Sequence, residues 1–328
     1  MKRTTVLTIA LLALLSAASC EKEITYTGEQ KEKKIVLFAV AKPGEAFEMQ
    51  VSHSLFFLDT SVARNRFIAS LDTVAGEVTI SVNGSSPVRM MTTVHEDDYY
   101  YFYPQPLYYA CSYIPKSGDR IRVEARFPGF DPVSAETVVP WAPVASVNSA
   151  RYVATGGKQE LQVSYSITDD ASYDKYYGFF PFLSERWEDD ETGTSSWYGY
   201  YCDFESNDPI FKQNSSNLSY LLDEDDFTGY IEDSFIKGRK YDFSITIHLN
   251  SGFDPYKYDE DWRMLTSVRT VTPGLFNYVM TYGKGGSNSI EGIFAEGVTL
   301  YGNVEGGYGC LGAVASVGLN VDLSEIID

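Results

Sequence analysis

The strongest constraint on the fold is a repeated pattern of short segments in which apolar and polar residues alternate. Val78, Ile80 and Val82 show this pattern most clearly, and Asn83-Gly84 follows them directly. Because successive side chains of a strand point to opposite faces, the alternation predicts a half-buried strand. Asn-Gly favours the tight turn of a hairpin. The segment therefore predicts a β-hairpin, and its repetition predicts a chain that is mainly β.

Segments of this kind and short apolar runs fill residues 35–140. They lie at 35–41, 47–54, 76–82, 88–94, 108–114, 119–127 and 131–140. About seven short strands with turn residues between them predict an immunoglobulin-like antiparallel β-sandwich. The proline-rich segment 140–143 forms a natural boundary, so we expect a sandwich domain over 35–140 and a second domain over 141–328.

The second domain is predicted to be β-rich with one short helix. Its strands are expected at 160–167, 176–183, 197–204, 240–249 and 264–271. Thr272 can cap the helix, Pro273 suits its first position, and Gly283 can end it. The apolar face of the helix is formed by Leu275, Phe276, Val279 and Met280. In the tail, 298–318, the density of glycine implies tight turns or close backbone packing.

The N-terminus has the pattern of a lipoprotein signal peptide. Lys2 and Arg3 precede an apolar stretch over 6–15, and small residues over 16–19 lead to Cys20. The stretch is too short to span a bilayer, whereas small residues before a cysteine suit cleavage and lipid attachment. We therefore predict a signal over 1–19, a Cys20 that carries diacylglycerol and a fatty acid such as palmitate, and a flexible tether over 20–34. The alternative is an ordinary secreted protein.

Composition excludes two classes of partner. The formal net charge is −19, which argues against nucleic acid and against contact of the protein surface with anionic lipid. The membrane is therefore expected to be reached through the lipid anchor alone. Cys111, Cys202 and Cys310 are far apart and form no metal-binding spacing, so they are expected to be buried thiols, with one disulfide as the alternative.

The sequence contains no recognisable catalytic set. His53, His95 and His248 lie in separate segments, and neither a metalloprotease motif nor a nucleophile elbow nor a phosphate-binding loop occurs. We therefore predict no catalytic residues, no cofactor and no metal. Carboxylates are plentiful, so a glycan hydrolase that uses two of them remains the third hypothesis.

Two aromatic clusters are the strongest candidates for a binding site. They comprise Tyr99, Tyr100, Tyr101, Tyr103, Trp187, Trp197, Tyr198 and Tyr200. Exposed aromatic rings offer apolar faces with polar edges, which suits a glycan or peptide ligand. The alternative is that alternate rings fill the core of a sheet.

Several segments together resemble one family. They are 35–38 with 43–44, 78–84, 118–123, 133–140, 235–241, 276–278 and the glycine-rich 301–313. In this order they resemble the Bacteroidota lipoproteins classed as domain of unknown function 4249. The chain departs from the family in having Leu311 at a position where an aromatic is expected, and in its tyrosine-rich segment near Tyr99. Glu21-Lys22-Glu23 after the cysteine likewise resembles an export signal to the exterior of the outer membrane, a solvated linker being the alternative.

The resemblance implies an outer-membrane lipoprotein that assists a TonB-dependent outer-membrane receptor. On this basis we expect a non-enzymatic accessory or ligand-capture protein, anchored by lipid and facing the cell exterior. A structural or adhesive surface module is the alternative.

Overall fold

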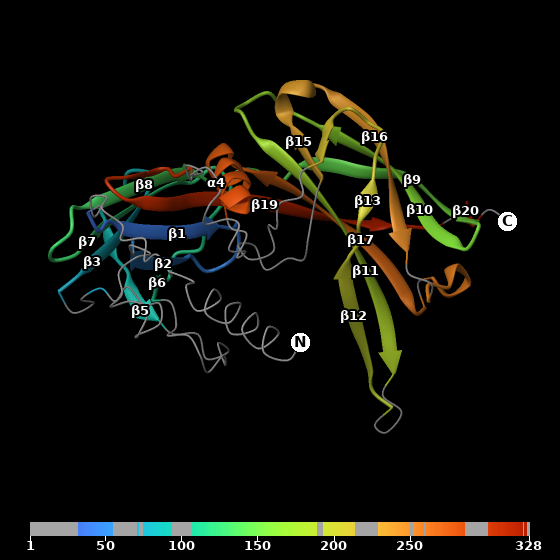
Figure 1. The fold of residues 1–328 in the computed structure, drawn as a ribbon, viewed down its shortest axis with the longest axis horizontal. Coiled ribbons are helices and arrows are strands. Elements are labelled where there is room, and N and C mark those ends of the chain that lie inside the picture. Colours follow the sequence, from blue (N-terminus) through green and yellow to red (C-terminus); the bar gives the residue numbers. More distant parts are fainter. Residues whose placement is uncertain are drawn as a thin grey trace, which may run out of the picture.

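The computed structural model describes residues 32–54, 71, 75–93, 107–188, 193–213, 229–249, 252–258, 260–285, 301–323 and 325–326. These residues form three β-sheets and one α-helix, α4, so the chain is mainly β as predicted (Figure 1). Two separate groups of buried apolar side chains divide the molecule into a first and a second lobe. The lobes share the largest sheet.

The large sheet has ten strands. In order, they are β14 (Phe211–Gln213), β15 (Gly229–Glu232), β11 (Tyr176–Glu188), β17 (Trp262–Val271), β19 (Tyr308–Val321), β1 (Ile35–Ala41), β2 (Glu48–His53), β6 (Tyr108–Ala110) and β5 (Met91–Thr93), with β12 (Ser195–Tyr201) paired to β11. This sheet forms one layer of both lobes.

Two five-stranded sheets complete the lobes. In the first lobe the order is β18 (Val304–Glu305), β8 (Val133–Val138), β7 (Arg120–Arg126), β3 (Glu77–Val82) and β4 (Val88–Arg89). In the second lobe the order is β13 (Phe204–Glu205), β16 (Lys240–Leu249), β10 (Lys158–Thr168), β9 (Val144–Thr155) and β20 (Glu325–Ile326). Two 3₁₀ turns, Asp233–Phe235 and Pro255–Lys257, lie in the second lobe.

Strand β19 runs through both lobes (Figure 1). Its first half pairs in parallel with β1, and its second half pairs antiparallel with β17. Leu311 and Ala313 belong to the core of the first lobe, whereas Cys310 and Val314 belong to that of the second. The tail of the chain therefore completes the first lobe, and the division into domains at residue 140 stays a prediction.

The first lobe is a two-sheet sandwich whose predicted strands are largely correct. Strand β1 matches the prediction, and Asn83 and Gly84 both have positive φ, as the predicted hairpin turn requires. The single strand expected over 88–94 is wrong, because the chain passes from one sheet to the other at the buried Met90. The predicted β-sandwich is largely antiparallel, and β1 has β19 as a parallel neighbour.

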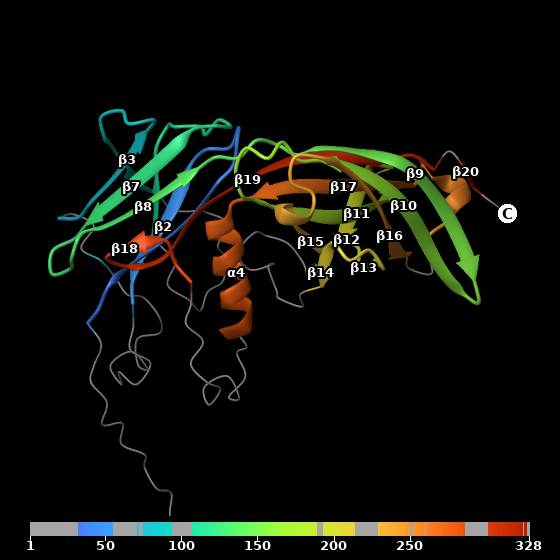
Figure 2. The ribbon, with the colours of Figure 1, turned by 90° about the horizontal axis from the view of Figure 1, so that it is seen from above.

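The second lobe contains the predicted strands and several that were missed, among them β9, β14 and β15. Strand β9 escaped prediction because Ala150 is its one buried residue, so it has no apolar alternation. Helix α4 (Pro273–Gly285) begins as predicted but continues past Gly283. Its apolar side chains pack on the large sheet, where Phe276 stacks on Tyr176, and the helix stands out from that sheet in Figure 2.

Glycine in the tail serves close backbone packing. A side chain at Gly309 would lie 1.9 Å from the carbonyl oxygen of Leu37, and its φ of 103° suits glycine alone. At Gly312 a Cβ would lie 2.5 Å from Cβ of Leu275, so this glycine lets α4 lie against the sheet. Of the two explanations for the density of glycine in the tail, close backbone packing is the one that applies to β19.

Candidate functional site: an aromatic arm and a serine trough

The ends of β11 and β12 form a hairpin that extends beyond the lobe, seen at the bottom of Figure 1. We call its residues 184–188 and 195–199 the arm. Their side chains are exposed except for that of Ser184, which is half-buried, although cross-strand pairing continues to Glu188 and Ser195. The arm therefore keeps its strand geometry without a core beneath it.

Three large aromatic side chains lie on the arm. Trp187 and Tyr198 are 51% and 66% exposed, and their rings meet edge to face at 6.3 Å on one side of the hairpin. Trp197 lies on the other side, where the Arg263 guanidinium stacks 4.2 Å from its ring centre. These rings are exposed and therefore contribute little to the hydrophobic core. Exposed aromatic rings of this size favour contact with a partner.

The structure brings together only part of the predicted aromatic set. Trp187, Trp197 and Tyr198 share the arm, and the partly exposed Tyr200 follows directly. Tyr99, Tyr100, Tyr101 and Tyr103 lie outside the described residues, as does the predicted lipidation site Cys20. The described aromatics therefore lie on one hairpin, and they come from the second cluster of the sequence.

A buried charge cluster lies at the start of β11, at the opposite end of that strand from the arm. Asp169 follows β10 and Lys175 precedes β11, and their side chains are almost fully buried at an N–O distance of 3.0 Å. Asp169 also accepts hydrogen bonds from the Tyr177 hydroxyl (2.7 Å) and the Gly238 amide (2.8 Å). Burial alone would raise the pKa of Asp169, but these hydrogen bonds hold it below its ordinary value.

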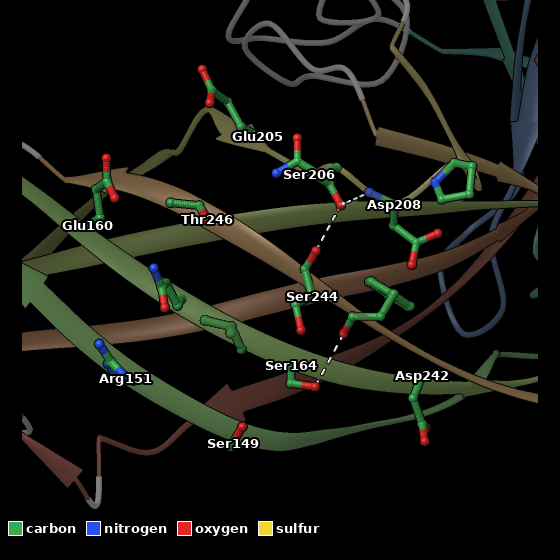
Figure 3. A pocket seen from close by; sticks show the side chains of 15 residues that line it. Ser149, Arg151, Glu160, Ser164, Glu205, Ser206, Asp208, Asp242, Ser244 and Thr246 are labelled. Carbon is green, nitrogen blue, oxygen red and sulfur yellow. Dashed lines mark hydrogen bonds between the residues drawn. The ribbon is translucent and has the colours of Figure 1, made fainter.

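The second candidate surface is a polar trough on the outer face of the smaller sheet of the second lobe. Its floor is a row of serines, Ser149, Ser164 and Ser244, which are direct neighbours on β9, β10 and β16. Ser206 continues the row in Figure 3, and we call the hollow the serine trough. Its volume is about 810 Å³, within the range of about 300–1,000 Å³ usual for ligand sites.

Larger polar side chains border this row. Arg151, Gln162 and Thr246 form the next row across the same three strands. Short serines between longer neighbours leave a hollow in an otherwise flat sheet face. The trough therefore follows directly from residue size at successive register positions.

The walls of the trough are fixed by hydrogen bonds. The Ser206 hydroxyl donates to the Ser244 carbonyl oxygen (2.8 Å) and accepts from the Asp208 amide (3.2 Å). The Asp208 carboxylate accepts from the Ile210 amide and the Tyr241 hydroxyl, both at 3.1 Å. This segment is thus held in place before any ligand arrives.

The Asp242 carboxylate, which also lines the trough, is fixed in the same way. Ser166 donates to the Asp242 carboxylate and lowers the pKa of that group below its ordinary value. Ser166 also bonds Asn148 at 2.9 Å. The polar groups that border the trough are therefore held by hydrogen bonds within the folded protein.

The histidines and cysteines take structural positions where they are described. His248 lies 3.7 Å from Glu160 and 3.6 Å from Glu205 at one end of the trough, whereas His53 packs on Phe130. Cys111, Cys202 and Cys310 are free thiols. Burial raises the pKa of Cys202 and Cys310 to about 12, so both remain protonated and unreactive. Within the described ranges, no group of three or more potential ligands could hold a metal ion.

The comparison with protein families identifies the chain. The family model for the Domain of unknown function (DUF4249) matches residues 21–318. The chain belongs to this family. No curated protein matches it.

The DUF4249 match covers both lobes, the arm and the trough. It also ends within β19, the strand that joins the two lobes. Across the described part of the chain, no helix combines the length and apolar character needed to span a bilayer.

Proposed function

We propose that the chain is a non-catalytic, lipid-anchored outer-membrane protein that assists a TonB-dependent receptor at the cell exterior. The lipid on Cys20 would attach it, and the tether over 20–34 would let the two lobes reach the receptor. The signal-like N-terminus and the resemblance to receptor-associated lipoproteins support this role.

The observation that carries the proposal is the exposed arm. Two of its aromatic side chains, Trp187 and Tyr198, are more than half exposed on a hairpin that has no core beneath it. Large amphipathic rings are enriched at the centres of protein interfaces, where a few of them supply most of the binding energy. We therefore assign receptor contact to the arm.

Co-purification tests this assignment. The full lipoprotein, expressed at its native level, is extracted in detergent and the recovered TonB-dependent receptor is quantified by mass spectrometry. Trp187→Ser combined with Tyr198→Ser should reduce recovery at least about tenfold, as loss of two interface anchors predicts. The matched control is Trp141→Ser with Tyr256→Ser, which removes rings that are even more exposed and lie outside the arm.

Equal recovery with the arm variant and the control would assign receptor contact elsewhere. Recovery of the wild-type protein only as a free monomer would contradict the accessory role itself. Cys20→Ala should release the protein from the membrane fraction. Persistent attachment of that variant would show that a partner, rather than lipid, holds it there.

A carboxylate-based glycan hydrolase is the second candidate, and one observation bears on it. Glu160 and Glu205 approach the same imidazole, His248, at the end of the trough. Two carboxylates across a sugar are what glycoside hydrolysis requires. Products from an oligosaccharide in the presence of the wild-type protein, lost in Glu205→Gln, would favour the hydrolase over the accessory role.

A further inference from the structure

The floor of the serine trough carries polar groups that the protein itself does not use. They are the side chains of Ser149, Arg151, Gln162, Ser244 and Thr246, which have no hydrogen bond or ion pair to any described residue. The walls, by contrast, are bonded within the protein. Binding of a ligand here would require it to replace water at adjacent donors and acceptors without rebuilding the site.

The charge of the lining disfavours anions. Glu160, Glu205, Asp208 and Asp242 face the trough, with Arg151 as the cation among the lining residues. A phosphate, an acidic glycan or an acidic peptide would meet net repulsion there. The surplus of carboxylates therefore excludes the class that an isolated arginine would otherwise suggest.

The polarity of the floor disfavours apolar ligands. Val163 and Phe243 border the trough through their backbones, because their side chains point to the core on the other face of the sheet. An apolar ligand would cover hydroxyls and an amide without pairing them, which costs free energy. The trough therefore selects for polar ligands.

A cationic ligand fits less well than a neutral one that both donates and accepts. An ammonium group has donors and no acceptor, so it would leave the Arg151 guanidinium and the Gln162 amide nitrogen unpaired. A hydroxyl group both donates and accepts. A row of serine, threonine, glutamine and arginine side chains is therefore matched by a row of hydroxyls.

We propose that the serine trough binds a neutral oligosaccharide across the strands of the sheet. From β9 to β13 the trough crosses four strands, about 14 Å at the usual strand spacing, which suits a short chain of sugar rings. Arg151, Gln162 and Thr246 bond its hydroxyls along one side, and the serine floor admits the rings. This inference deepens the proposed function by naming its ligand class, on a surface separate from the arm.

An oligosaccharide array tests the proposal. The purified full-length lipoprotein in detergent is applied to neutral, uronic-acid and amino-sugar oligosaccharides, and the strongest neutral binder is then titrated calorimetrically. Ser164→Tyr fills the centre of the floor and should weaken binding at least about tenfold. Gln162→Ala removes a bonding group without filling space and should weaken binding by a smaller factor. Thr168→Tyr is the matched control, since it adds the same ring to the same face of β10 outside the trough.

The possible outcomes distinguish the proposal about the ligand from the proposal about the receptor. Binding of neutral oligosaccharides that Ser164→Tyr and Gln162→Ala weaken and Thr168→Tyr preserves supports the proposal. The absence of any bound neutral oligosaccharide, a preference for acidic or amino sugars, or equal loss in Thr168→Tyr would overturn it. The arm variant should bind the oligosaccharide as the wild type does. A failure to recover the receptor would therefore contradict the proposed function without affecting the proposed ligand. Unchanged thermal unfolding of the variants shows that they are folded.

Discussion

The arm and the serine trough belong to the same lobe but are built in opposite ways. On the arm, Trp187 and Tyr198 are large, exposed and held by backbone pairing, and their loss would leave the cores intact. In the trough, Ser206 and Asp208 are small polar residues whose hydrogen bonds are part of the fold. Affinity on the arm would come from the rings themselves, whereas in the trough it would come from a shape already fixed.

One buried charge cluster supports the lobe to which both surfaces belong. Asp169 and Lys175 join the end of β10 to the start of β11, at the end of β11 opposite the arm. A change in this pair should therefore lower the stability of the lobe, whereas a change within the arm or within the trough should affect one surface.

The largest effect is expected from Asp169→Asn. It leaves Lys175 buried without its full partner, and breaking a buried ion pair costs about 3–5 kcal/mol. The free energy of unfolding, measured with urea, should fall by this amount. Asp174→Asn is the control, because its ion pair with Lys237 is exposed and should contribute less than about 1 kcal/mol. Equal losses in the two variants would contradict the role of the buried cluster.

Acid should weaken the same support. Lys175 also bonds Asp170 at 2.7 Å, which lowers the pKa of that carboxyl as well. Because the pKa values of both Asp169 and Asp170 are lowered in the folded protein, their contribution is complete above the ordinary carboxyl pKa of 3.8 and is lost as pH falls below it. Asp233 acts in the opposite direction, since burial raises its pKa and protonation relieves that cost. Unfolding free energies between pH 6 and about 3 should therefore fall more steeply for the wild type than for Asp169→Asn. Parallel curves would show that the cluster does not titrate as described.

A smaller effect is expected from Asp208→Ala. The Ile210 amide and the Tyr241 hydroxyl lose their acceptor, which should cost about 1–3 kcal/mol, the usual penalty for a donor left unpaired. Affinity for the oligosaccharide should fall with it, since this wall of the trough loses its fixed position. An unchanged affinity in calorimetric titration would mean that the wall does not shape the site.

The smallest effect on stability is expected from the arm variant. Trp187→Ser with Tyr198→Ser removes rings that rest on no core, so the free energy of unfolding should change by about 0.5 kcal/mol or less. Denaturant titration of the wild type and the variant measures this directly. A loss of several kcal/mol would show that the rings stabilise the fold, and their exposure would then carry no argument for binding.

Local patterns predicted much of the fold. Strands β1 and β16 match their predicted ranges, β1 because it is an apolar run that ends at Lys42-Pro43-Gly44, and β16 because apolar residues alternate along it. The role of β19 could not be predicted in this way. Val36 pairs with Tyr308, and no short-range pattern reports a parallel pairing between such distant segments. The sequence signal that bore on β19 was its density of glycine, which indicated close backbone packing.

The arm and the serine trough also differ in how far the sequence predicted them. The density of aromatic residues in the sequence indicated Trp187, Trp197 and Tyr198. It did not indicate which of the aromatic residues would lie together on one hairpin. The trough was missed because its serines are the ordinary polar half of alternating strands. Only the register that places Ser149, Ser164 and Ser244 side by side makes them a site.

The separation of the two surfaces is the central claim, and one paired measurement tests it most directly. Oligosaccharide affinity and receptor recovery are measured for the arm variant and for Ser164→Tyr, using the same full-length preparations. We expect the arm variant to lose the receptor and keep the oligosaccharide, and Ser164→Tyr to do the reverse. Loss of both activities in either folded variant would contradict the account, because the arm and the trough would then act as one site.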